Sequence, residues 1–112
     1  MNVQFTARHF KARPELQQFA EDSVQGLSSL YDGIVDVEVI LEEESHSDGG
    51  KRAEIKVNVY KDQLFAKDRS NDFAKSISGC VEKLERQLTK YKAKLHEGQH
   101  PHEKPEFITD EE

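Results

Sequence analysis

Residues 71–95 read NDFAKSISGCVEKLERQLTKYKAKL, and this stretch decides the fold. Apolar residues recur along it at spacings of three and four, which places them on one face of an α-helix. Ser70, Asn71 or Asp72 can cap its start, and Gly98 and Pro101 end it. The stretch therefore predicts a helix of at least about six turns that buries one face. The buried stripe comprises Phe73, Ile77, Cys80, Val81, Leu84, Leu88, Tyr91 and Leu95.

A second, basic stripe runs along the same helix. With about 100° per residue, Lys83, Arg86, Lys90 and Lys94 fall within about 80°, and Gln87 lies at the edge of this sector. Its centre lies roughly 110–120° from that of the apolar stripe. Separated cations suit successive phosphates of structured RNA, and Arg86 can bond a phosphate through two N–H groups. The alternative is that these cations only solvate the helix and complement its C-terminal dipole.

The distribution of charge supports the RNA hypothesis. The chain has a formal net charge of −6, which by itself argues against nucleic acid. Residues 83–95 nevertheless carry five basic residues and one acidic residue, whereas residues 1–82 and 96–112 each have a net charge of −5. A polyanion responds to the local potential more than to the total.

Two alternating stretches precede the helix and predict strands. In the first, Val35, Val37, Val39 and Leu41 alternate with Asp36, Glu38, Ile40 and Glu42. In the second, Ala53, Ile55, Val57 and Val59 alternate with Arg52, Glu54, Lys56 and Asn58. Residues 43–50 form an acidic connector between them, and a third, shorter strand over 64–67 follows a turn at Lys61-Asp62. Tyr60 points away from the core side, as a half-exposed strand residue or one that stacks on a base.

The N-terminal part adds a strand over residues 2–6 and a helix over residues 14–31. Pro14 suits a first helical turn, although Gly26 should cost about 1 kcal/mol relative to Ala. The order βαβββα predicts an α+β fold, a four-stranded sheet with both helices packed on one face. The first two strands are parallel if they are neighbours.

Composition indicates one domain over residues 1–95 and a disordered acidic tail over residues 96–112. No segment approaches the length of a membrane span, and no secretory signal is visible. The single cysteine, Cys80, falls on the apolar stripe and fits a cytoplasmic protein with a buried thiol.

The tail contains a literal H-E-x-x-H pattern at residues 96–100, the pattern of zinc proteases. That chemistry needs two imidazoles one helical turn apart, and here Gly98 and Pro101 end the helix. We therefore expect no catalytic residue, no metal and no cofactor. A metal-dependent hydrolase remains a minor alternative, which the metal content of the purified protein tests.

Two segments carry a resemblance to a known family: residues 71–77, NDFAKSI, and residues 81–90, VEKLERQLTK. They closely resemble the last helix of the ribosome hibernation-promoting factor and ribosome-associated inhibitor family, also called sigma-54 modulation proteins. The run K-L-x-R-Q-L-x-K at residues 83–90 is the most specific part. The similarity extends over residues 1–95, and the family fold is the βαβββα order obtained above from periodicity.

The resemblance implies a non-enzymatic inhibitor of translation that binds the small ribosomal subunit in the mRNA and tRNA channel, with no membrane or small-molecule partner. It implies RNA binding through Lys83, Arg86, Gln87, Lys90 and Lys94. Relatives often carry cations on the first helix where this chain has Ser23, Gly26 and Ser29, so part of the usual basic surface is absent. A module that binds protein rather than rRNA, as the sigma-54 label suggests, is the alternative.

Overall fold

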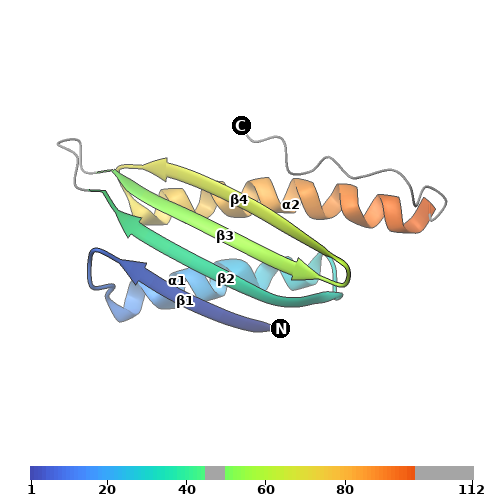
Figure 1. Cartoon of the computed structure of the whole chain (residues 1–112), viewed down its shortest axis with the longest axis horizontal. Helices are drawn as coiled ribbons and strands as arrows, with labels where there is room; N and C mark the ends of the chain where they lie inside the picture. The colour runs from blue at the N-terminus through green and yellow to red at the C-terminus, as the bar shows by residue number, and fades with distance from the viewer. Residues whose placement is uncertain (45–49, 98–112) are drawn as a thin grey trace.

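The computed structural model describes the backbone of residues 1–44 and 50–97 and the side chains through residue 94. The predicted tail began at residue 96, but α2 includes the backbone of residues 96 and 97. The rest of the tail, residues 98–112, and the side chains of residues 95–97 lie outside the described part. The elements, labelled in Figure 1, are β1 (Asn2–Arg8), α1 (Pro14–Gln25), the 3₁₀ helix η1 (Gly26–Ser29), β2 (Ile34–Glu43), β3 (Lys51–Val59), β4 (Asp62–Ser70) and α2 (Phe73–Glu97).

The four strands form one sheet in the order β1-β2-β3-β4. β1 pairs with β2 in parallel, and the other two pairs are antiparallel. Figure 1 shows both helices on the same face of the sheet, which leaves the other face open. The predicted α+β class, the βαβββα order and the placement of both helices on one face are confirmed.

The core lies between the sheet and the helices. β2 and β3 contribute Val39 and Ile55, and α2 contributes Ile77, Leu84 and Leu88; all five side chains are fully buried. Burying one such side chain contributes roughly 1.5–3 kcal/mol, so the apolar stripe of α2 supplies a large part of the stability. Two aromatic pairs stabilise the packing of α2, one at its first residue and one in its last two turns. Phe73 stacks on Phe10 with ring centroids 4.5 Å apart, and Tyr91 meets Tyr31 edge to face at 5.6 Å.

The prediction of a single helix over residues 14–31 is wrong after residue 25. The α-helix ends at Gln25, and a 3₁₀ turn begins at Gly26. Glycine at position 26 has a lower helix propensity than any residue except proline. In addition, the Ser28 hydroxyl donates to the Gln25 carbonyl at 2.7 Å and so competes with the helical hydrogen bonds. The tighter turn still buries Leu27 completely. The spacing of apolar residues therefore identified a buried segment but not its change of helix type.

The placement of Val35 beside Val37 on the core side is also wrong. The pairing of β2 with β3 shifts between Ile34 and Asp36, so one extra residue interrupts the alternation. Ile34 takes the core position with 8% exposure, and Val35 is 56% exposed. The prediction had assumed an unbroken period of two.

The strands extend beyond their predicted ends. In these extensions polar side chains pair across neighbouring strands, and no apolar alternation marks them in the sequence. β2 extends to Glu43, whose carboxylate lies 3.1 Å from the Lys51 ammonium on β3. β4 spans Asp62–Ser70 rather than residues 64–67, and β1 reaches Arg8. These strand ends lack an alternating apolar pattern because charged residues, rather than apolar ones, occupy them.

Leu84→Ala should lower the free energy of unfolding by about 2–5 kcal/mol, because it leaves a cavity where α2 packs on the sheet. Glu85→Ala, at the exposed neighbouring position, is the matched control and should change it by no more than about 0.5 kcal/mol. Urea unfolding measures both values. Equal stability of the two variants would contradict the assigned core.

Cys80 should react slowly with thiol reagents in the native protein. Its thiol donates to the Ala53 carbonyl at 3.3 Å, and burial, with a smaller effect of Asp68, raises its pKa to about 12. The folded state therefore holds the proton more tightly than the unfolded state. The associated stability is present below the ordinary cysteine pKa and is lost as pH rises toward 12. Labelling at pH 8 should become fast only in denaturant, and equally fast labelling of native protein would contradict burial.

Candidate nucleic-acid interface

The side of α2 that carries the basic stripe lies along the outer edge of β4. Alternate residues of an edge strand turn their backbone groups away from the neighbouring strand. The Lys83 ammonium donates to the Lys67 carbonyl at 2.7 Å, and the Gln87 amide donates to the Phe65 carbonyl at 3.0 Å. Two side chains of α2 therefore cap two edge carbonyls, which also protects this edge from pairing with another chain.

Gly79 lies on α2 opposite a charged side chain of β4. A Cβ at this position would overlap the carboxylate of Asp68. The absence of a side chain therefore leaves room for that carboxylate between the helix and the strand.

The five predicted RNA-binding residues differ in their exposure to solvent. Gln87 is 7% exposed, lies against β4, and its side-chain oxygen is buried without a hydrogen-bond partner among the described residues. Arg86, Lys90 and Lys94 are exposed. Arg86 and Lys90 form no ion pair with any described residue. Lys83 is intermediate, because it caps Lys67 through one of the three N–H donors of its ammonium group.

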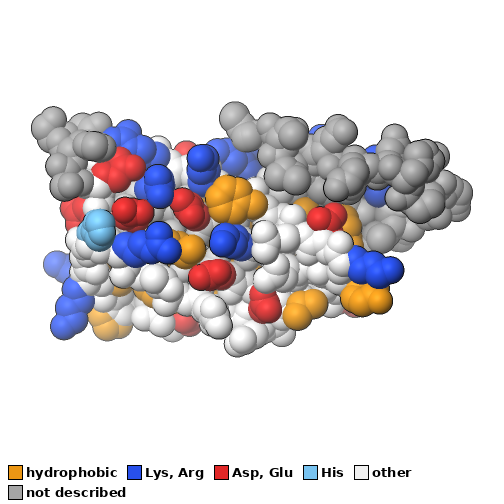
Figure 2. Space-filling view, in the orientation of Figure 1, with side chains coloured by type: hydrophobic (Ala, Val, Ile, Leu, Met, Phe, Trp, Pro, Cys, Tyr) orange, Lys and Arg blue, Asp and Glu red, His pale blue; other side chains and the backbone are white. Residues whose placement is uncertain are grey.

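On the open face of the sheet, two arginines are paired with acidic side chains. Arg52 lies 3.2 Å from Glu42 and 3.0 Å from Glu54, and Arg69 lies 2.6 Å from Glu44. Figure 2 shows acidic and basic side chains interleaved on this face. Such exposed pairs contribute about 0–1 kcal/mol each, but they cancel the local potential. Arg52 and Arg69 therefore do not extend the positive surface of α2.

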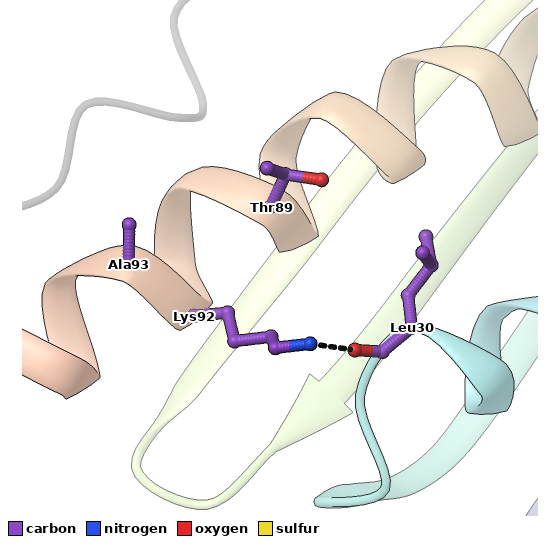
Figure 3. Close-up of a pocket in the computed structure, with 4 residues that line it drawn as sticks. All are labelled: Leu30, Thr89, Lys92 and Ala93. Carbon is purple, nitrogen blue, oxygen red and sulfur yellow. Dashed lines mark hydrogen bonds between the residues drawn. The ribbon is translucent and has the colours of Figure 1, made fainter.

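Lys92 lies on the side of α2 opposite to the basic stripe. Its ammonium group donates to the Leu30 carbonyl at 2.9 Å, beside a hollow of about 220 Å³ lined by Leu30, Thr89, Lys92 and Ala93 (Figure 3). This contact ties α2 to the segment that follows η1. Lys92 therefore contributes to packing rather than to the basic stripe.

Tyr91 connects α2 to the tip of the β3–β4 hairpin. Its hydroxyl donates to the Tyr60 carbonyl at 3.1 Å. Burial is the largest cause that raises the pKa of Tyr91, and the nearby Tyr31 and Asp62 raise it further. The phenol therefore stays protonated at neutral pH and acts as a hydrogen-bond donor. The side chain of Tyr60 itself is 71% exposed. The strand pattern predicted that Tyr60 points away from the core but gave no sign that it lies beside α2.

The arrangement can bind an extended anion but offers no metal centre among the described residues. No group of three or more His, Cys, Asp or Glu side chains converges within residues 1–44 and 50–94. None of the described helices has the length and apolar character that crossing a membrane requires. The side of α2 along β4 instead presents cations about one helical turn apart, as contacts with successive phosphates require.

The chain is similar to known proteins in both sequence and fold. The model of the family described as sigma 54 modulation protein / S30EA ribosomal protein matches residues 3–96. A ribosome hibernation promoting factor of Klebsiella oxytoca is 27% identical over 95 residues, which cover 85% of this chain and 97% of that protein. A ribosomal subunit interface protein of Coxiella burnetii superimposes with a TM-score of 0.75 and 26% identity, over 83% of this chain and 99% of that one.

A third similarity concerns the fold alone. The N-terminal domain of Thermus thermophilus Protein Y superimposes with a TM-score of 0.73 at 22% identity, over 81% of this chain and 99% of that domain.

Gln87→Met should lower the free energy of unfolding by about 1–3 kcal/mol. Methionine has a similar length but no amide, so the Phe65 carbonyl loses its partner at a covered position. Arg86→Met, at the adjacent exposed position, is the control and should change stability by about 0.5 kcal/mol at most. Denaturant unfolding of both variants makes the comparison, and a neutral Gln87→Met would contradict the capping role.

Proposed function

Because the chain belongs to the sigma 54 modulation protein / S30EA ribosomal protein family, we propose that it is a ribosome hibernation factor that binds the small ribosomal subunit. In this proposal it occupies the channel used by mRNA and tRNA and blocks initiation of translation. It makes and breaks no covalent bond, needs no cofactor and acts in the cytoplasm, where ribosomes are found.

One observation carries the proposal: Arg86 and Lys90 project from α2 into solvent and have no acidic partner among the described residues. A cation without a protein partner can exchange its counterions for a phosphate, and the release of those counterions favours binding. Arg86 offers a planar pair of donors to one phosphate, and Lys90 acts as a point charge one turn further along. rRNA provides phosphates at fixed positions, so α2 can recognise its shape.

The remaining predicted residues take different roles in this proposal. Lys83 and Lys94 add charge at either end of the exposed pair, and Lys83 keeps donors free after capping Lys67. Gln87 is a positioning residue, because its amide holds α2 against β4. The phosphate contacts are therefore Lys83, Arg86, Lys90 and Lys94.

The second candidate is a protein-interaction module without direct rRNA binding, and the acidic balance of the chain outside residues 83–95 favours it. Such a module would use the interleaved charges of the open sheet face rather than α2 (Figure 2). Variants of α2 distinguish the two candidates, because a protein partner on the sheet does not contact Arg86 or Lys90.

Replacing Arg86 and Lys90 together with Ala should weaken binding to purified small subunits at least about tenfold, because two charge-assisted contacts are lost. Sedimentation of the protein with the subunits through a sucrose gradient measures the affinity. The fold should be retained, since both side chains are exposed and lie off the apolar stripe.

The matched control is Arg8→Ala with Lys11→Ala. It removes the same charge from exposed positions in and just after β1, at the opposite edge of the sheet. Its affinity should stay within about twofold of wild type, a difference of about 0.4 kcal/mol. Equal losses in the two double variants would mean that only net charge matters, and an unchanged affinity of the α2 variant would remove α2 as the binding surface.

A further inference from the structure

The tip of the β3–β4 hairpin displays an aromatic side chain that the core does not use. Tyr60 is 71% exposed, the highest value among the large hydrophobic residues described. It directly precedes Lys61, whose φ of 70° lies in the left-handed region that non-glycine residues seldom adopt. This turn places the Lys61 ammonium 5.5 Å from the centroid of the Tyr60 ring. One aromatic ring and one cation are thus presented together at the turn.

The tip adjoins the basic side of α2. Contacts from Lys83 to Lys67 and from Gln87 to Phe65 show that this side of α2 follows β4 toward the hairpin. At the end of that path, Tyr91 donates to the Tyr60 carbonyl. Figure 1 shows α2 continuing past the hairpin. The backbone of the tip therefore lies beside α2 at Tyr91, and the Tyr60 side chain is exposed there.

We propose that Tyr60 is a stacking platform for an unpaired base of RNA, with Lys61 contacting a phosphate beside that base. The inference rests on the proposed function and adds a contact with single-stranded RNA to the phosphate contacts of α2. A planar base can lie on an exposed ring, and sites for single-stranded nucleic acid combine aromatic rings with cations that follow the backbone.

The chemistry of the tip favours a nucleotide over a protein partner. The residues that follow Tyr60 along the chain are Lys61, Asp62 and Gln63, all of them polar. Asp62 is unfavourable for a phosphate placed directly on it, but its carboxylate accepts the Gln63 backbone N–H at 2.8 Å. A single ring beside a cation matches one base and its phosphate, whereas a protein interface needs a larger apolar surface.

Tyr60→Leu and Tyr60→Phe test the proposal, because leucine keeps an apolar side chain without a ring and phenylalanine keeps the ring. Tyr60→Leu should weaken binding to purified small subunits by about fivefold to a hundredfold, and Tyr60→Phe should retain the affinity. Phe19→Leu, at an exposed aromatic position on α1, is the control and should bind like wild type.

A short oligoadenylate at low salt provides a second readout that involves no protein. The chain has three tyrosines and no tryptophan, so its intrinsic fluorescence comes from tyrosine. Stacking should quench the emission of the wild-type protein. Tyr60→Phe should bind the oligonucleotide without that quenching, since Tyr91 is buried and Tyr31 is half-buried.

The outcomes separate this inference from the proposed function. If wild-type protein does not bind small subunits, both are overturned. If it binds and Tyr60→Leu binds equally well, the stacking platform is overturned and the proposed function stands. If Tyr60→Leu binds subunits weakly but binds oligoadenylate like wild type, the tip contacts a ribosomal protein, which also overturns base stacking.

Discussion

The docking of α2 on the sheet is the constraint on which the rest of the structure depends. The apolar stripe of α2 packs against β3, β4 and α1. This packing fixes the rotation of the helix about its own axis. Because the basic stripe lies roughly 110–120° away on the same helix, its direction follows from the same packing. Gly79 leaves room for the Asp68 carboxylate between α2 and β4, and Gln87 holds the helix against β4 through the Phe65 carbonyl.

Two separate arrangements of charge follow from this docking. On the sheet, acids and bases alternate across neighbouring strands, and Arg52 and Arg69 are paired with glutamates. Between Phe73 and Lys94, α2 has two acids, Glu82 and Glu85, and both fall outside the basic sector. A chain with a net charge of −6 can therefore present a local positive surface. The acidic remainder should discourage binding to nucleic acid in any other orientation.

Much of the fold could be predicted because long periodic segments reflect burial directly. The alternation in β2 and β3 and the stripe of α2 each predicted their element. The failures at Gly26 and Val35 have local causes, a 3₁₀ turn and a shift in strand pairing, that leave only a weak trace in the pattern. For the site, helical periodicity predicted the angle between the two stripes but could not identify the element beside the basic stripe. This element is β4, and Gln87 is buried against it. Both facts depend on contacts between residues far apart in the chain.

The central claim is that cations of α2 bind rRNA by displacing counterions from phosphates. The most direct test is the slope of the logarithm of the small-subunit affinity against the logarithm of salt concentration. It should be measured for wild-type protein and for the variant in which Arg86 and Lys90 are both Ala. Each phosphate contact contributes about 0.7–0.9 to this slope, so removing two should reduce its magnitude by about 1.4–1.8. A variant that binds more weakly but keeps the wild-type slope would contradict the claim, because Arg86 and Lys90 would then act without contacting phosphates.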